Sequence, residues 1–231
     1  APGVSAMKTL AIWQPFLSRP YVAGVLHGDG WCTSKTLGLR CKDADFAETF
    51  AGAVNDICGT QLSPATDERG YSLVRTSNRR GRFNRLRAHQ PTDNDELGWW
   101  LRGLFDSEGN AQLWLNKAAG PASFHRRVAI YSTRLPTLER AAEYLDWLDV
   151  PNGIRATRNS ATHKGTKTVF ELRMLRQEGF SRFAEMVGSS IARKRANLEA
   201  IVASYQPAGW QARNWQKAVL ARHPHLAGGT S

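Results

Sequence analysis

Hydrophobic positions along the chain follow two periods, one that predicts helices and one that predicts strands. Apolar side chains three or four residues apart predict an amphipathic helix over residues 43–57, with Phe46, Phe50 and Val54 on one side. Short stretches rich in β-branched and aromatic residues predict strands. In the first half the predicted strands cover residues 31–34, 37–42 and 70–76, and the arginine-rich residues 79–89 are predicted to be helical.

The second half shows the same order of periods. Residues 153–158 and 168–175 predict a hairpin around the polar loop 160–165. The remaining predicted strands cover residues 111–115 and 128–133, and the predicted helices cover residues 136–148, 180–187 and 191–205. Together with the helix that opens each half, the pattern is approximately α-β-β-α-β-β-α in both halves.

That opening helix contains a nine-residue segment that occurs twice. Residues 22–30 read VAGVLHGDG and residues 101–109 read LRGLFDSEG, so that Asp29 and Glu108 lie 79 residues apart (108 − 29). Two copies in the same order of apolar, small and acidic positions, separated by about one small structural unit, indicate an internal duplication.

Signals at both ends predict that each copy belongs to a helix. Ser18 and Pro20 provide a cap and a first-turn proline before the first copy. Asp93 followed by Glu96 has the spacing of a capping box before the second copy. Each copy closes on a glycine, a residue that commonly ends a helix.

Small residues four apart lie on one face of each predicted helix, at Gly24 and Gly28 in the first copy and at Gly103 and Ser107 in the second. Such a face allows the backbone of a partner helix to approach closely. The duplication makes the other copy the expected partner, packed around a pseudo-two-fold axis.

The two acids then lie at helix C-termini, where the helix dipole is negative. Two carboxylates that meet at an interface also repel each other and resist ionisation. A divalent cation between Asp29 and Glu108 would offset both costs. The alternative is that the acids are solvated turn residues, and the presence of two copies in register favours the cation.

The charge balance points to a polyanionic partner. The chain has 31 Lys and Arg against 20 Asp and Glu, a formal net charge of +11. Seven arginines and no acid occur between residues 69 and 90, and Arg193, Lys194 and Arg195 form a second basic group. Arginine offers a fork of donors that matches phosphate oxygens, so nucleic acid is the expected partner.

Composition excludes other classes and sets the expected location. The chain has no stretch of 18 apolar residues, so a membrane-spanning helix and a membrane partner are not expected. Three cysteines without a CxxC pair predict reduced thiols rather than a zinc site, and hence an intracellular protein. The excess of Arg over Lys favours a prokaryotic cytoplasm, with an organelle as the alternative.

At the two nine-residue segments the sequence resembles the LAGLIDADG homing endonucleases of the monomeric, two-motif type. The resemblance implies an α+β fold: two pseudo-symmetric αββαββα halves, motif helices packed at the centre, and two curved antiparallel sheets that form a DNA-binding saddle. The expected units are residues 7–88 and 95–206, joined by a linker at 89–94 and followed by a tail at 207–231.

The resemblance also implies the chemistry of the site. The motif positions of Asp29 and Glu108 are those whose carboxylates bind catalytic Mg²⁺, and the backbone carbonyls of Gly28 and Ser107 occupy positions that add a ligand. Mn²⁺ is expected to substitute, and Ca²⁺ to bind without supporting cleavage. His27 and Arg102 depart from the motif, at positions that are not metal ligands.

Basic and polar side chains complete the expected site. Lys42, at the end of a predicted strand, and Lys194, in a basic segment that resembles the family's C-terminal helix, are candidates to stabilise charge on the phosphate. Alternating outward positions of the strands are candidates for contacts with bases and phosphates. These are Trp31, Thr33, Lys35, Arg40, Lys42, Arg75, Gln112, Trp114, Asn116, Arg127, Tyr131, Arg155, Arg158, Lys167 and Arg173.

The sequence therefore predicts a monomeric, metal-dependent endonuclease that cleaves both strands of a specific DNA site. The alternative is a binding protein on the same scaffold, either a maturase for group I intron RNA or a DNA-binding protein that does not cleave. Retention of an acid in both motifs favours cleavage.

Overall fold

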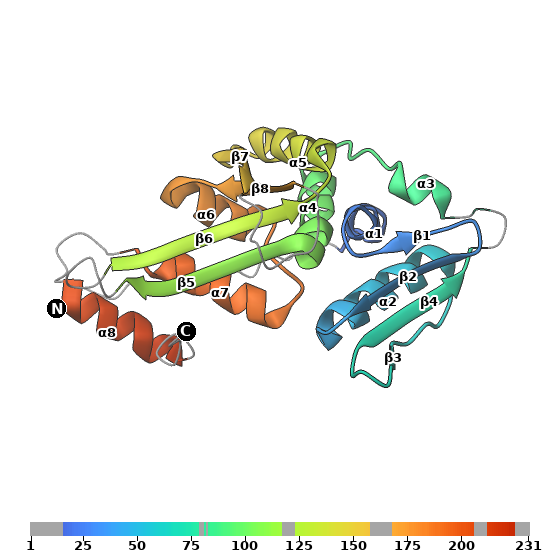
Figure 1. Ribbon diagram of the computed structural model, residues 1–231, viewed down its shortest axis with the longest axis horizontal. Helices are drawn as coiled ribbons and strands as arrows, with labels where there is room; N and C mark the ends of the chain where they lie inside the picture. The colour runs from blue at the N-terminus through green and yellow to red at the C-terminus, as the bar shows by residue number, and fades with distance from the viewer. Residues whose placement is uncertain are drawn as a thin grey trace.

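The computed structural model describes residues 16–78, 81, 83–116, 123–157, 168–205 and 212–224. They form two halves, each built on a four-stranded antiparallel sheet (Figure 1). The first half contains α1 (Ser18–His27), β1 (Trp31–Cys32), β2 (Thr36–Cys41), α2 (Ala44–Cys58), β3 (Ala65–Thr66), β4 (Ser72–Ser77) and α3 (Asn84–Arg87). The second contains α4 (Asn94–Glu108), β5 (Gly109–Asn116), β6 (Ser123–Ser132), α5 (Leu135–Trp147), β7 (Asn152–Thr157), β8 (Val169–Met174), α6 (Arg176–Met186), α7 (Ala192–Ala203) and α8 (Ala212–Arg222).

The two sheets have the same topology. Their strand orders are β1-β2-β4-β3 and β5-β6-β8-β7, so the second half repeats the pairing of the first. The α+β fold in pseudo-repeated halves, predicted from the sequence, is confirmed. The first two strands of the second sheet are longer than their equivalents: β5 and β6 have 8 and 10 residues, whereas β1 and β2 have 2 and 6.

Helices cover one face of each sheet and enclose a core there. In the first half α2 packs on β2 and β4, and Phe46 and Phe50 are buried with Leu37, Leu39 and Val74. In the second half α5, α6 and α7 cover the sheet over a larger core. Alternate side chains of the strands point to the opposite, outer face, as the two-residue period requires.

The contact between α1 and α4 joins the halves, and both helices lie between the two sheets (Figure 1). A Cβ added at Gly24 would lie 2.0 Å from the carbonyl oxygen of Trp100. A Cβ added at Gly103 would lie 2.2 Å from the carbonyl oxygen of Tyr21. Because residues 24 and 103, and residues 21 and 100, are equivalent in the repeat, the contact is the same in both directions and defines a pseudo-two-fold axis.

Most elements lie where the sequence predicts them. Asp93 caps α4, since its side chain accepts a hydrogen bond of 2.9 Å from the Glu96 N–H. The Glu96 carboxylate accepts in return from the Thr92 N–H at 2.8 Å, one residue before the position that a capping box uses. The cap predicted at Ser18 is wrong. Ser18 is the first residue of α1, and its hydroxyl donates to the Asp56 carboxylate at 2.7 Å.

The helix predicted over residues 79–89 is wrong in extent. In the described part of this segment the helix covers only Asn84–Arg87. Gly81 has a left-handed φ of 65°, and the Asn78 side chain accepts from the Phe83 N–H, so a side-chain-stabilised turn replaces the start of a helix.

The apolar character of Trp147 predicts that it belongs to the core, but this side chain is 67% exposed. It lies at the end of α5 between Leu145 and Leu148, which occupy the buried side of that helix. A further helix, α8, occurs in the tail for which no element was predicted, and its Val219 joins the second core.

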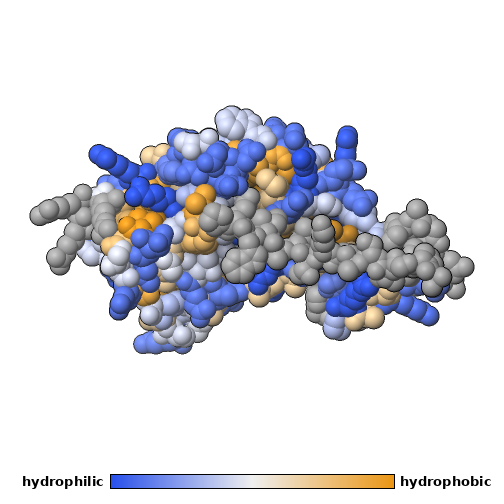
Figure 2. Space-filling view, turned by 180° about the vertical axis from the view of Figure 1, so that it is seen from behind, coloured by the Kyte–Doolittle hydropathy of each residue, from blue (hydrophilic) through white to orange (hydrophobic). Residues whose placement is uncertain are grey.

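Seen from behind, the surface is mainly hydrophilic with separate hydrophobic patches (Figure 2). In the part of the chain that the structure describes, no helix combines the length and apolar character needed to span a membrane.

We predict that Gly24→Ala destabilises the protein, because the new methyl group would collide with the backbone of α4. The expected loss is about 3 kcal/mol in the free energy of unfolding, or about 6–12 °C in the thermal midpoint for a chain of this size. Gly52→Ala is the matched control. Gly52 is an exposed position of α2 with nothing within 4 Å of an added Cβ, and alanine there should stabilise by about 0.5–1 kcal/mol. Equal thermal midpoints for the two variants would contradict the close contact between α1 and α4.

Candidate active site

The ends of α1 and α4 bring the two repeated acids to one place. Helix α1 ends at His27, with Asp29 in the following turn, and Glu108 is the last residue of α4. A Cβ added at Gly28 would lie 2.4 Å from the Ser107 Cβ and 3.0 Å from the Glu108 Cγ. The residues before the acids therefore touch across the pseudo-two-fold axis, and only a glycine fits at position 28.

The environment of the acids disfavours negative charge. Burial raises the pKa of Glu108 to about 7, with a further contribution from the charge of Asp29. Partial burial also raises the pKa of Asp29, and the positive charge of Lys194 acts in the opposite direction on both acids. Repulsion between two carboxylates is relieved when a cation binds between them.

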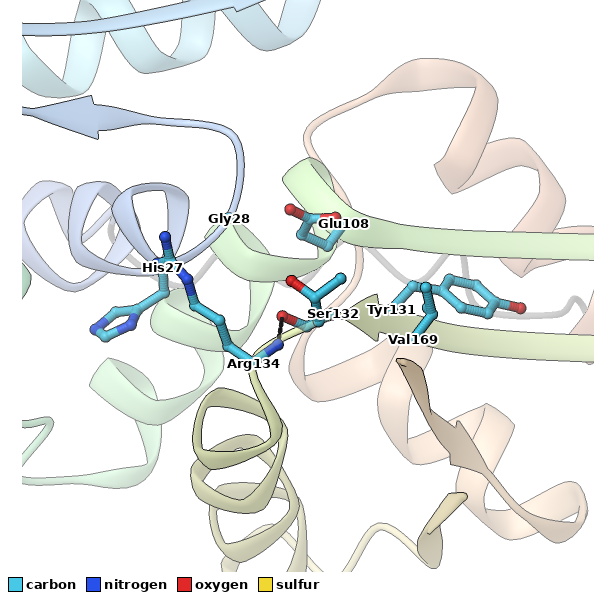
Figure 3. Close-up of a pocket in the computed structure, with 8 residues that line it drawn as sticks. His27, Gly28, Glu108, Tyr131, Ser132, Arg134 and Val169 are labelled. Atoms are coloured by element: carbon cyan, nitrogen blue, oxygen red, sulfur yellow. Dashed lines mark hydrogen bonds between the residues drawn. The ribbon is translucent and has the colours of Figure 1, made fainter. Parts of the chain in front are cut away.

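A hollow of about 310 Å³ opens beside Glu108 (Figure 3). His27 and Gly28 line it from α1, and Tyr131 and Arg134 line it from the end of β6 and the turn before α5. The Arg134 side chain points toward the end of α1 (Figure 3). Its charge lowers the pKa of Glu108, although burial prevails.

A second hollow, of about 520 Å³, opens beside Asp29. It is lined by Asp29, Arg40, Lys42, Tyr71 and Lys194, among others. Glu108 thus lines one hollow with Arg134, and Asp29 lines the other with Lys42 and Lys194.

Lys194, predicted to assist catalysis, is held within the fold. It is 4% exposed, and its ammonium group donates to the carbonyl oxygens of Phe105 and Asp106, each at 2.8 Å. These carbonyls belong to the last turn of α4, so the ammonium group offsets the negative end of that helix. Burial lowers the pKa of Lys194 to about 8. These contacts favour a role in holding the end of α4 beside the acids.

Arg134 is the residue that the sequence reasoning missed. Lys42 directly follows β2, and Arg134 lies two residues after β6, the equivalent strand of the second sheet. Each side chain lines the hollow of its own half. The signal was available, since both are the basic residues that follow the second strand of a repeat.

The candidates for DNA contact on the second sheet share its outer face. Their neighbours Leu113, Val128, Ile130 and Leu172 are buried in the core, so alternation places the candidates on the other side. This set is Gln112, Trp114, Arg127, Tyr131, Arg155 and Arg173. Asn116 lies at the end of β5, and Arg158 and Lys167 lie outside the described residues.

The candidates on the first sheet are fewer and partly engaged within the chain. The Trp31 ring lies over Gly38, where an added Cβ would be 2.4 Å from it, and Arg75 is exposed opposite Gly38 on β4. Arg40 pairs with the Asp67 carboxylate at 2.6 Å. In the exposed turn after β1, the Thr33 hydroxyl accepts from the Lys35 N–H at 3.2 Å, so Thr33 shapes the turn.

Comparison with known proteins agrees with this fold. Residues 95–188 match a family model described as a LAGLIDADG-like domain. A mesophilic variant of the homing endonuclease I-DmoI is 16% identical over 74% of this chain and 94% of its own, with a TM-score of 0.54. This chain has a LAGLIDADG-like fold.

Two further structures share the LAGLIDADG-like fold. I-DmoI in complex with DNA and Ca is 15% identical over 79% of this chain and 96% of its own, with a TM-score of 0.54. Full-length DUF199/WhiA from Thermatoga maritima is 19% identical over 92% of this chain and 70% of its own, with a TM-score of 0.56. No curated protein sequence matches this chain. At identities this low, the structural similarity establishes the fold alone, and the activity is inferred from the residues of the site.

The donor set fits a hydrated divalent cation. Within the described residues no group of three or more His, Cys, Asp and Glu side chains could enclose a metal ion. Mg²⁺ does not need such a cage, since it binds through one or two carboxylates and keeps waters or phosphate oxygens as its other ligands. Asp29 and Glu108 are of this kind, two neighbouring carboxylates that each line an open hollow.

We predict that Glu108→Gln stabilises the metal-free protein at pH 8. The Glu108 pKa is about 7 in the folded chain against an ordinary value of 4.5, so ionisation of this carboxyl costs stability as the pH rises from 4.5 to 7. Above that window the variant should gain about 1–2 kcal/mol in the free energy of unfolding, less than the full shift implies because solvent screens the carboxylate. The gain should vanish near pH 4.5.

Thermal unfolding with a chelator, at pH 4.5 and pH 8, measures this difference. Glu48→Gln, at an exposed position of α2, is the control that removes a carboxylate elsewhere. A loss of stability in Glu108→Gln at pH 8 would show that the site does not disfavour the ionised form of this carboxyl.

Proposed function

We propose that this protein is a metal-dependent, site-specific endonuclease that cleaves both strands of DNA. The observation that carries the proposal is that Asp29 and Glu108, one from each repeat, lie at the contact of Gly28 with Ser107, and that each lines a hollow that also holds a basic side chain. Two acids related by a pseudo-two-fold axis match the two antiparallel strands of a duplex, whose scissile phosphates have the same symmetry. The hydrolysis of a phosphodiester at each strand needs one activated water and one stabilised leaving oxygen.

The carboxylates of Asp29 and Glu108 would hold the divalent ions, with the backbone carbonyls of Gly28 and Ser107 as further ligands. Such ions supply a water of lowered pKa and neutralise charge on the phosphate and the leaving oxygen. Structures of I-DmoI, which has the same fold, are described in complex with DNA and Mn and with DNA and Ca. By that analogy Mg²⁺ or Mn²⁺ would support cleavage, and Ca²⁺ would support binding.

The protein's own groups bind and orient the DNA. The outer faces of the two sheets present arginine, tryptophan and amide side chains to the duplex, which suits contacts with phosphates and base edges. Lys42 in one hollow and Arg134 in the other would donate to oxygens of the phosphate that enters that hollow. Lys194 would keep the end of α4, and with it Glu108, in position.

The fold by itself does not establish cleavage, because structures under different names, I-DmoI and DUF199/WhiA, share it. A DNA-binding protein without cleavage, or a maturase for group I intron RNA, would not require both acids. Burial raises the pKa of both Asp29 and Glu108, so keeping these acids ionised costs stability. A protein that only binds DNA would gain stability if these two acids were replaced, and their retention therefore favours the nuclease.

We predict that Asp29→Asn and Glu108→Gln each lower cleavage in Mg²⁺ by about 10³-fold or more, because each removes a ligand of the metal ions. The substrate is a duplex selected from a randomised library by binding in Ca²⁺. Both variants should still bind that duplex in Ca²⁺ by gel shift. Glu48→Gln should cleave at the native rate, and full cleavage by both site variants would refute the mechanism.

We predict that Lys42→Ala and Arg134→Ala each slow the cutting of one strand, by about 10²-fold, because each side chain serves one hollow. Each variant should accumulate a nicked duplex, and the uncut strand should differ between them. Cleavage of a duplex with a different label on each strand measures this directly. Arg134→Lys should restore part of the rate. Equal slowing of both strands in both variants would mean that the hollows do not act separately.

A further inference from the structure

A fully buried carboxylate lies on the outer face of the second sheet. Glu171, on β8, is 0% exposed, although its neighbour Leu172 is the residue that points into the core. In the strand register Glu171 lies between Tyr131 of β6 and Arg155 of β7. This acid sits in the middle of the surface that we propose binds DNA, a place where a negative charge opposes phosphate binding.

Two arginines and a tyrosine cover the Glu171 carboxylate. One oxygen accepts from the Arg127 Nε and Nη2, both at 2.8 Å, and from the Tyr131 hydroxyl at 3.4 Å. The other oxygen accepts from the Arg155 Nε at 2.7 Å. Burial raises the pKa of Glu171, but the hydrogen bonds and charges of Arg155 and Arg127 outweigh it and lower the pKa below its usual value. The acid is therefore ionised, and the cluster carries one net positive charge instead of two.

The pairing leaves Arg155 oriented but accessible. Its side chain is 57% exposed, and Glu171 engages only its Nε. The two terminal amino groups of a guanidinium held in this way can donate side by side to O6 and N7 of guanine, the most common specific arginine contact in the major groove. Arg127, with Nε and Nη2 both engaged and 27% exposed, is more enclosed. A side chain fixed before binding also loses less rotamer entropy when it meets a base.

The first sheet provides a contrast. Arg40 pairs there with Asp67, whose side chain is 25% exposed and binds this one arginine. A partly exposed pair of this kind contributes little free energy, although Asp67 accepts from both the Nε and the Nη2 of Arg40, at 2.7 and 2.6 Å. The buried acid with two arginines occurs on the second sheet, next to the Glu108 hollow that Tyr131 also lines.

We propose that Glu171 is a positioning residue for sequence recognition. It fixes Arg155 to read one base pair beside the Glu108 hollow, and its negative charge weakens the binding of DNA of unrelated sequence. The proposal rests on the proposed function in one respect, that the outer face of the second sheet binds duplex DNA.

The test measures discrimination and general affinity separately. The native chain and its variants bind, in Ca²⁺, the selected duplex, each of its single base-pair substitutions, and a duplex of unrelated sequence. Arg155→Ala first identifies the base pair that Arg155 reads. Glu171→Gln should then lose about tenfold discrimination at that same base pair. It should also bind the unrelated duplex about two- to fivefold more tightly, with a steeper salt dependence, because one negative charge is gone.

Asp67→Asn is the matched control, because it removes the same charge from an arginine partner on the other sheet. It should keep discrimination at the Arg155 base pair. The double variant Glu171→Gln/Arg127→Gln keeps the net charge unchanged and avoids a buried unpaired arginine, so it tests the proposal even where Glu171→Gln folds poorly. It too should lose discrimination at the Arg155 base pair.

The outcomes distinguish a failure of the positioning role of Glu171 from a failure of the proposed function. Native discrimination in the Glu171 variants would overturn the role of Glu171 and leave the proposed function standing. An equal loss of affinity for every duplex would show a purely structural role and would also overturn it. A native chain without any sequence preference would overturn both the positioning role and the proposed function.

Discussion

The close contact between the backbones of α1 and α4 is the constraint on which the rest of the structure depends. Gly24 and Gly103 permit it, because a side chain at either position would meet a carbonyl of the other helix. The same contact continues to the helix ends, where Gly28 meets Ser107. It fixes the pseudo-two-fold axis, places the two sheets on either side, and leaves the repeated acids no position except beside that axis.

This packing has an electrostatic cost that the surrounding residues reduce without removing. Both helices direct their negative ends at the acids, and burial disfavours ionised carboxylates. Lys194 caps α4 from within, and buried Asp106 is held by hydrogen bonds from Tyr21 and Ser189 at 3.0 and 2.5 Å. In the proposed function, a divalent ion bound by the two carboxylates would relieve the remaining electrostatic cost.

The sequence predicted the features that repetition and periodicity encode. The motif helices, the α+β halves and the equivalent sheets follow from local patterns that occur twice. It did not predict that Lys194 would be buried against α4, or that Glu171 would hold two arginines, because both depend on which distant side chains share a face. The short helix α3 and exposed Trp147 were missed for a related reason, since tertiary contacts and side-chain-stabilised turns override helical and apolar patterns there.

The proposed function requires a cation that is bound jointly by the two repeats. Anomalous diffraction from Mn²⁺, in crystals of the protein with its selected duplex, locates such a cation most directly. The account predicts anomalous peaks within direct coordination distance of carboxylate oxygens from both Asp29 and Glu108, adjoining a backbone phosphate of the DNA. Peaks at other residues only, with these two carboxylates free of metal in a complex that cleaves, would contradict it.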